Sequence, residues 1–188
     1  MDCGRARPQL MVSAAMTFTE NWFGEGSCNT LVSLASNVGN VDGEIVEIGS
    51  WEGRSTCALA NAVYPRIVHA VDHWKGSPGE PSEQLAQGRD VYKRWQANVK
   101  QLTKGNVIAH RMGWRDYPIP PTAFVFIDAE HSYQEVRDCV AAFLPHLVSG
   151  GIICGDDSHH EPVRRALFDV LPAWSIYVQT TVWSWRKP

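Results

Sequence analysis

The chain has 188 residues, of which 44% are hydrophobic and 20% charged, a balance typical of a globular protein and not of a disordered chain. This length favours one domain and leaves no room for a separate substrate domain. The formal net charge of -3 provides no basic excess for binding phosphates, and no apolar stretch is long enough to span a bilayer, so neither nucleic acid nor a membrane is an expected partner.

The first 40 residues differ in pattern from the rest of the chain. Residues 1–16 show no clear period and are expected to form a loose arm. Residues 29–37 carry apolar side chains at helical spacing and predict a short amphipathic helix, with Ser27 as a possible cap. We therefore divide the chain into an N-terminal arm and helix, 1–40, and a main domain, 41–188.

From residue 44 onward, short apolar strands alternate with helical segments. The predicted strands are 44–48, 67–71, 106–110, 123–127 and 151–154, and the predicted helices between them are 54–61, 84–102 and 133–147. Alternation of this kind indicates βαβ units, and hence a parallel sheet with helices on both faces.

The C-terminal part breaks this rhythm. A predicted helix at 162–171 is followed by two aromatic strands, 175–179 and 181–185, with no room for a crossover helix between them. These two strands must therefore pair antiparallel. The predicted fold class is α/β: a Rossmann-like, doubly wound, mostly parallel sheet of about seven strands that ends in an antiparallel hairpin.

A glycine turn follows the first strand, in the sequence EIGSWEGRS. Gly49 permits a tight turn, and Gly53 allows a close approach of the backbone to a ligand or of the helix to the sheet. The motif that seats a pyrophosphate needs a glycine two residues after the first, where this chain has Trp51. The turn is therefore consistent with a nucleotide-like ligand but a poor fit for a dinucleotide.

Asp72 ends the second strand, 23 residues beyond Gly49. An acidic side chain at this position can accept hydrogen bonds from both hydroxyls of a ribose. The alternative is that Asp72 caps the turn formed with His73 and Trp74. The glycine turn before it favours the ribose role.

Three aspartates follow two other strands, Asp128 after the fourth and Asp156 and Asp157 after the fifth. If these strands are neighbours, the carboxylates converge at one edge of the sheet. Their mutual repulsion then needs a raised pKa, a basic partner or a cation. The alternative is that they only cap turns and strand ends.

Four stretches, EIGSWEGRST, HAVDHWKGS, FVFIDAEHSY and LVSGGIICGDD, resemble class I S-adenosylmethionine-dependent methyltransferases. Within that class the chain is similar to the branch of macrocin-type sugar O-methyltransferases and cephalosporin-hydroxylase-like proteins. The resemblance covers about residues 44–157 and implies S-adenosyl-L-methionine as cofactor. The residues that it implies for cofactor binding are Glu47, Gly49, Ser50, Trp51, Gly53, Asp72, His73, Gly113, Trp114 and Asp128.

The resemblance assigns these residues to different ends of the cofactor. Glu47 and Gly49 would face the methionine end, and Asp72 would hold the ribose. His73 and the pair Gly113–Trp114 would lie near the adenine, with Trp114 as a possible stacking wall.

The resemblance also implies that Asp128, Asp156 and Asp157 bind Mg²⁺ or another divalent cation. Catechol-type O-methyltransferases end the fifth strand with aspartate-asparagine, so the aspartate pair here favours the sugar branch.

Glu130 and His131 follow Asp128 directly, and each is a candidate for the base that deprotonates an acceptor hydroxyl. A helix cap and a structural histidine are their ordinary alternatives. His159 or His160 could contact the acceptor.

The expected function is cation-assisted O-methylation of a hydroxyl on a small molecule, a sugar or a natural product. The alternatives are a catechol-type O-methyltransferase and a nucleoside-binding protein without turnover, whereas the glycine pattern disfavours a nicotinamide-dependent oxidoreductase. The eight tryptophans and the arm favour a homodimer whose partner helps to enclose the pocket. Five cysteines without a CxxC pair indicate a reducing cytoplasm.

Overall fold

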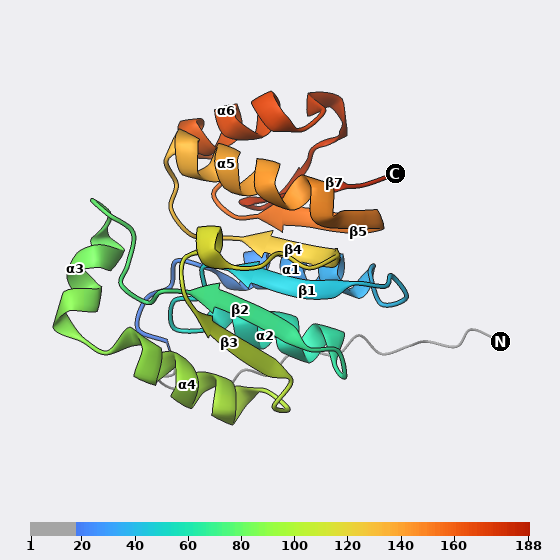
Figure 1. Ribbon diagram of the computed structural model, residues 1–188. Helices are drawn as coiled ribbons and strands as arrows, with labels where there is room; N and C mark the ends of the chain where they lie inside the picture. Colours follow the sequence, from blue (N-terminus) through green and yellow to red (C-terminus); the bar gives the residue numbers. More distant parts are fainter. Residues whose placement is uncertain (1–17) are drawn as a thin grey trace.

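The computed structural model describes residues 18–188, apart from the side chain of Trp174, so the predicted arm at 1–16 lies outside the described residues. Seven strands form one sheet in the order β3-β2-β1-β4-β5-β7-β6 (Figure 1). Their bounds are β1 Glu44–Ile48, β2 Val68–Asp72, β3 Val107–Arg111, β4 Thr122–Ile127, β5 Leu147–Gly155, β6 Tyr177–Gln179 and β7 Val182–Arg186.

The direction of the strands confirms the predicted topology. The first five strands pair parallel to one another, in the pairs β1–β2, β1–β4, β2–β3 and β4–β5. β7 pairs antiparallel with both β5 and β6, so the sheet ends in a hairpin. The strand order reverses between β1 and β4, and open α/β sheets bind ligands at such a switch point, beyond the carboxyl ends of the strands.

Helices cover both faces of the sheet. α1, α2 and α4 pack on one face and α5 and α6 on the other, while α3 lies beyond the carboxyl ends of the strands (Figure 1). Their bounds are α1 Glu25–Ser36, α2 Arg54–Val63, α3 Pro81–Gly88, α4 Val91–Leu102, α5 Tyr133–Phe143 and α6 Glu161–Val170. In the described part of the chain, no helix is long and apolar enough to cross a membrane.

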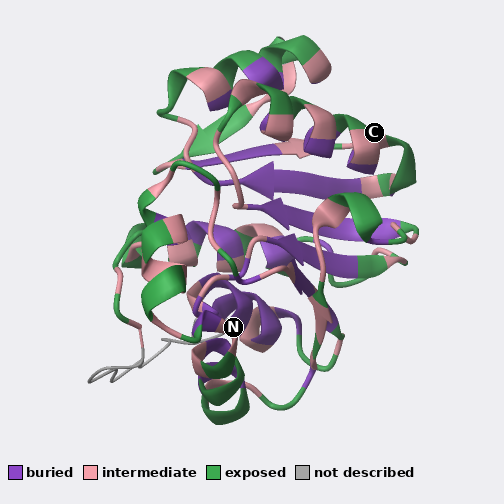
Figure 2. Ribbon diagram, turned by 60° about the vertical axis from the view of Figure 1, so that its left-hand side comes forward, coloured by how far each residue is buried: buried purple, intermediate pink, exposed green. Residues whose placement is uncertain are grey.

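The central strands are buried on both faces (Figure 2), as their near-continuous apolar sequences require. Leu31 and Ala35 of α1 pack into the same core as Ile45, Phe124 and Phe126 of the sheet. The segment from α1 onward is therefore one packed unit. The cysteines in the described residues, Cys28, Cys57, Cys139 and Cys154, are free thiols.

The predicted helix 84–102 is wrong, because the structure has two helices here. α3 ends at Gly88, and Arg89 adopts an extended conformation with φ -155° and ψ 155°. Asp90 then caps α4, accepting a hydrogen bond from the backbone N–H of Lys93 at 2.9 Å. The sequence of residues 84–102 contains no proline and has mixed polarity throughout, so its pattern gives no sign of the break between the two helices.

Other boundaries also differ from the prediction. α5 ends at Phe143, because Pro145 lies in a short 3₁₀ turn, and β5 begins at Leu147, earlier than residue 151. α1 begins after Gly24, and Ser27 lies inside the helix, where its hydroxyl is 3.0 Å from that of Thr181. Ser27 thus joins α1 to the C-terminal hairpin and does not cap the helix.

Candidate active site

A cavity of about 590 Å³ opens beyond the carboxyl ends of the strands. Its walls come from the segments that follow β1, β2, β3, β4 and β5, and from α3. This volume lies in the usual range for small-molecule sites. The glycine turn, Asp72 and the aspartates after β4 and β5 all contribute to this one cavity, so the fold brings together the two predicted sites.

The turn after β1 requires glycine at its first position. Gly49 has φ +84°, and a Cβ at this position would lie 2.0 Å from the backbone oxygen of Asp128. The N–H of Gly49 donates to the carbonyl of Val71 at 3.0 Å. The turn thus packs closely against the ends of β2 and β4. Gly53, with φ +90°, forms the N-cap of α2.

Glu47 lies beneath this turn, on the side of α2, and is fully buried. One of its oxygens accepts hydrogen bonds from the hydroxyls of Ser50, at 2.7 Å, and Thr56, whereas the other has no partner. Burial raises the pKa of Glu47 to about 7, against the opposing effect of the hydroxyls. The contacts make Glu47 a support of the turn, and its predicted contact with the methionine end stays a prediction.

Asp72 also supports the turn. One of its oxygens accepts hydrogen bonds from the backbone N–H groups of Ser50, at 2.8 Å, and Trp51, at 2.9 Å, and the other accepts from the N–H of Trp74. Asp72 also lines the cavity. Carboxylate oxygens have further lone pairs, so a ribose contact is compatible with these bonds and stays a prediction.

The residues predicted near an adenine lie at the β2–β3 end of the cavity. His73, Gly113 and Trp114 all line it. The indole N–H of Trp114 donates to Glu135 of α5 at 3.1 Å, and the guanidinium of Arg115 lies 4.3 Å from the centre of its ring. The indole is therefore fixed, which suits a wall for a flat ligand.

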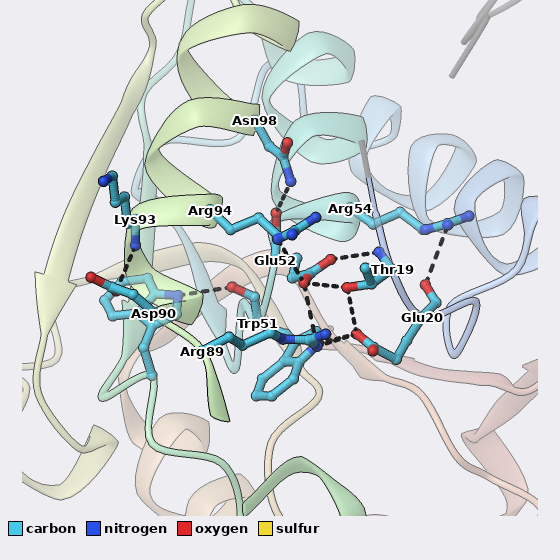
Figure 3. A network of polar contacts seen from close by, with 11 residues as sticks. Thr19, Glu20, Trp51, Glu52, Arg54, Arg89, Asp90, Lys93, Arg94 and Asn98 are labelled. Atoms are coloured by element: carbon cyan, nitrogen blue, oxygen red, sulfur yellow. Dashed lines mark hydrogen bonds and ion pairs between the residues drawn. The ribbon is translucent and has the colours of Figure 1, made fainter. Parts of the chain in front are cut away.

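Residues 18–23, here called the N-terminal segment, lie across the glycine turn through a network centred on Glu52 (Figure 3). Glu52 is only 2% exposed and accepts hydrogen bonds from the N–H of Thr19, at 2.7 Å, and from its hydroxyl. Arg89 and Arg94 each place a nitrogen 3.3 Å from the same oxygen of Glu52. Asn98 donates to the carbonyl of Glu52 at 2.8 Å. Glu52 thus ties the N-terminal segment to α4.

Glu20 forms a second set of contacts in this network (Figure 3). It accepts from the indole N–H of Trp51 at 3.0 Å and from the guanidinium of Arg89. Trp22 lies against Trp51, with ring centroids 5.3 Å apart, and contributes to the wall of the cavity. The N-terminal segment therefore completes the site at the β1 side.

At the acidic end, the strand register brings the aspartates together. Ile127 of β4 pairs with Gly155 of β5, so Asp128 and Asp156 follow directly paired residues. All three aspartates line the cavity. The three aspartates thus lie at one edge of the sheet, where Asp128 and Asp157 each place an oxygen within 4.8 Å of the other and of His131.

His131 lies within the acidic cluster. Its Nε2 is 2.7 Å from Asp157 Oδ2 and 3.8 Å from Asp128 Oδ1, and its Nδ1 is 3.0 Å from Glu80 Oε1. Burial alone would lower the pKa of His131, but the neighbouring carboxylates of Asp128, Asp157 and Glu80 raise it to about 12. In this structure the imidazolium is the basic partner of the carboxylates.

The aspartates differ in their surroundings. Burial and then the charge of Asp128 raise the pKa of Asp156 to about 6, while the hydroxyl of Thr181 donates to its carboxylate. Burial likewise raises the pKa of Asp128. Against its own burial, the hydrogen bond with His131 holds the pKa of Asp157 below its usual value.

Two groups in the described residues bring three metal-ligating atoms within 4.8 Å of one another. One is Asp128, His131 and Asp157, and the other is Asp157, His159 and His160. Asp156 is in neither group. Glu130, the other candidate base, lines the cavity.

The comparisons with known proteins agree with this geometry. A family model described as a methyltransferase domain matches residues 46–158, which include the glycine turn and the aspartates after β4 and β5. The chain belongs to this methyltransferase family. It has the Rossmann-like α/β fold of the class I S-adenosylmethionine-dependent methyltransferases.

Solved structures of methyltransferases share the fold. The O-methyltransferase NovP superposes with a TM-score of 0.67 at 21% identity, over 87% of this chain and 80% of that one. CalS11, a TDP-rhamnose 3'-O-methyltransferase, gives 0.62 at 17% identity, over 87% and 81%. TomG from Streptomyces achromogenes, solved with S-adenosylmethionine, gives 0.60 at 17% identity, over 86% and 79%. Among curated proteins, the sequence has no match.

Several residues at the methyltransferase site were not predicted from the sequence. They are Glu20, Trp22, Glu52, Glu80 and Arg89. Each acts through a partner far away in the chain, and Glu80 stands in a Gly/Pro/Ser-rich loop that carries no periodic signal. The acidic side chain in that loop is the one feature that could have drawn notice.

Proposed function

We propose that this protein transfers the methyl group of S-adenosyl-L-methionine to a hydroxyl of a small molecule, a sugar or another natural product, with the help of a divalent cation. The observation that carries the proposal is the single cavity with two chemically different ends. Asp72 and the glycine turn form one end, which suits a nucleoside. Asp128, Asp156 and Asp157 form the other, which suits a polar acceptor.

The acidic end fits a divalent cation. Asp128, His131 and Asp157 each offer one ligand atom, all within 4.8 Å of one another. Carboxylate oxygens suit Mg²⁺, and the imidazole nitrogen also suits a transition metal. Such a cation, when bound, lowers the pKa of a coordinated hydroxyl. Asp156 accepts its hydrogen bond from Thr181, and its role as a further ligand is part of the proposal.

Methyl transfer needs mainly alignment and a deprotonated nucleophile. The glycine turn and Asp72 would fix the cofactor, and the aspartates would orient the acceptor hydroxyl. His131 or Glu130 would take the proton, since both stand at the cavity wall close to Asp128. His131 can do so only in its neutral form, which a cation beside it would favour because a nearby positive charge lowers the pKa of an imidazole.

A cation-independent site is the second candidate, because the imidazolium of His131 already balances Asp157 and Asp128. In that case the aspartates would hydrogen-bond the acceptor directly. Removal of metal by a chelator separates the two candidates.

The test uses a methyl-donor assay against hydroxylated sugars, catechols and amino-sugar natural products. We expect chelator to abolish transfer without unfolding the protein and Mg²⁺ to restore it. Asp157→Asn should keep affinity for S-adenosylhomocysteine and lose most turnover, and Asp128→Asn should also lose most turnover. Asp42→Asn, at an exposed position before β1, should behave as wild type. Full activity in excess chelator would overturn the proposal that a cation takes part in the reaction.

Calorimetry with S-adenosylhomocysteine and NAD side by side tests the cofactor. Binding of the first alone supports the proposal, and binding without turnover on any acceptor would favour a nucleoside-binding protein.

We also propose a homodimer, because Phe168, Tyr177 and Val178 leave large apolar side chains exposed. Light scattering at micromolar concentration checks it, and a monomeric mass would end the idea.

A further inference from the structure

The loop between β2 and α3 places a carboxylate against His131 from across the cavity. Glu80 Oε1 accepts the backbone N–H of His131 at 3.1 Å and lies 3.0 Å from its Nδ1. The two residues are 51 positions apart in the chain. His131 therefore bridges the two walls, with Glu80 on one side and Asp157 on the other.

This contact decides which nitrogen of His131 faces the acidic cluster. A carboxylate only accepts hydrogen bonds, so Nδ1 must carry the proton that is shared with Glu80. The other nitrogen, Nε2, is then the atom beside Asp157 and Asp128. Once the ring releases one proton, Nε2 is therefore the nitrogen that can bind a cation or exchange a proton with an acceptor.

The loop is built to hold Glu80 in place. Gly76 has φ +75°, and a Cβ there would lie 2.3 Å from the backbone of Ser82, so only glycine permits this turn. The N–H of Ser77 donates to the hydroxyl of Ser82 at 2.9 Å, and the N–H of Gly79 donates to Glu83 at 2.9 Å. These bonds close the loop onto the start of α3, where Glu80 is the N-cap residue.

Partial burial strengthens the contact. The side chains of His131 and Glu80 are 28% and 26% exposed, so water competes little for the hydrogen bond. Carboxylates that orient a histidine in this way fix its tautomer and ring position in metal sites, and their loss weakens metal binding by about 10- to 100-fold.

We propose that Glu80 is a positioning residue, which holds the His131 imidazole through Nδ1 and so presents Nε2 to the acidic cluster and the acceptor. The inference rests on the proposed function for the use of Nε2, but the orientation itself is a property of the protein without any ligand. The loop before α3 thus orients a reactive side chain, in addition to forming part of the cavity wall together with α3.

The test compares Glu80→Ala and Glu80→Gln with Glu83→Gln, which removes a charge from the first turn of α3 without touching His131 and keeps an oxygen that can accept from the N–H of Gly79. The first readout is the side-chain ¹⁵N spectrum of the metal-free protein, with His131 assigned through His131→Asn. We expect Glu80→Ala to shift both ring nitrogens of His131. Glu80→Gln should largely restore them, because an amide oxygen can still accept from Nδ1, and Glu83→Gln should leave them unchanged.

The second readout is the affinity for Mn²⁺ or Mg²⁺, measured by calorimetry. We expect Glu80→Ala to weaken it by about 10- to 100-fold, with the affinity for S-adenosylhomocysteine changed less than threefold. Unshifted His131 signals in Glu80→Ala, or the same shift in Glu83→Gln, would overturn the positioning role. A wild type that binds no divalent cation would overturn the metal part of the proposed function, while the spectrum still decides the role of Glu80.

Discussion

The indole of Trp22 lies against the indole of Trp51, with ring centroids 5.3 Å apart and planes at 37°. Trp22 comes from the N-terminal segment and Trp51 from the glycine turn, and both face the cavity. The Trp51 ring is also held by a hydrogen bond to Glu20. A residue from before α1 therefore forms a wall at the end of the cavity assigned to the cofactor.

Replacing Trp22 should weaken cofactor binding more than it affects folding. Trp22 is 53% exposed, so Trp22→Ala removes little core packing. Losing the aromatic wall should raise the Kd for S-adenosylhomocysteine by about 3- to 10-fold, the size of one aromatic contact, and Trp22→Phe should recover part of it. Calorimetry measures the Kd, with Tyr64→Ala, at an exposed position after α2 and outside the cavity wall, as control. An unchanged Kd would remove Trp22 from the site.

The ion pairs of Glu52 and of Glu161 should differ in their contribution to stability. Glu52 is 2% exposed and contacts both Arg89 and Arg94 at 3.3 Å, whereas the pair Arg165–Glu161 is more than half exposed on both sides. Glu52→Ala leaves Arg94 and Thr19 without their acceptor and Arg89 with Glu20 alone, so we expect a loss of about 2–3 kcal/mol in the free energy of unfolding.

Removing Glu161 should cost less than about 1 kcal/mol, because water screens an exposed pair. Urea titration of both alanine variants checks the contrast. Equal losses would show that the network at Glu52 holds the N-terminal segment in place without adding to global stability.

The strands and the acidic edge could be predicted from the sequence, because both follow from local patterns. β4 is an apolar run that ends at a charged residue, and β1 is a short strand rich in isoleucine and valine that ends at a glycine turn. Both signals can be recognised in the sequence without knowledge of the neighbouring strands. The convergence of Asp128 with Asp156 then needs only the assumption that their strands are adjacent, which the register confirms.

The supporting contacts could not be predicted, because their partners are far apart in the chain. Glu20 and Arg89 are separated by 69 residues, and Glu80 and His131 by 51. A periodic pattern does not indicate such pairs, and these four side chains are polar, so they do not contribute to the apolar pattern that predicts helices and strands. The break between α3 and α4 was missed for a related reason, since Arg89 at the break contacts Glu20 and Glu52, which are far away in the chain.

Asp72→Ala should lose both cofactor affinity and stability. The ribose assignment predicts that S-adenosylhomocysteine binds more weakly by about 2 kcal/mol or more. The structure adds a second loss of about 1–3 kcal/mol in unfolding free energy, because the N–H groups of Ser50, Trp51 and Trp74 lose their acceptor.

Calorimetry and thermal unfolding separate these two effects, with Asp42→Ala as the control for removing an exposed carboxylate. Lost stability with unchanged affinity would limit Asp72 to holding the turn and would reject the ribose contact. Lost affinity with unchanged stability would show that the backbone N–H groups find water instead.

Glu47 should make the stability of the protein depend on pH in a direction opposite to that of an ordinary salt-bridged carboxylate. Burial raises its pKa in the folded protein to about 7, from an ordinary value of 4.5. Between these pH values the folded state holds a proton that the unfolded state has released, so the free energy of unfolding falls as the pH rises. The contribution is complete below pH 4.5 and is lost as the pH passes 7.

Glu47→Gln removes this titration and keeps an oxygen that can accept from Ser50 and Thr56. Going from pH 5 to pH 8, the wild type should therefore lose up to about 3 kcal/mol of unfolding free energy relative to Glu47→Gln, since each pH unit between the two pKa values corresponds to about 1.4 kcal/mol. Urea titrations at several pH values measure the difference, and groups common to both proteins cancel. Glu25→Gln, at an exposed position in the first turn of α1, is the control. A constant difference in unfolding free energy between wild type and Glu47→Gln across this range would mean that Glu47 is ionised in the folded protein. Its second oxygen would then accept a hydrogen bond from a water molecule or from a neighbouring side chain.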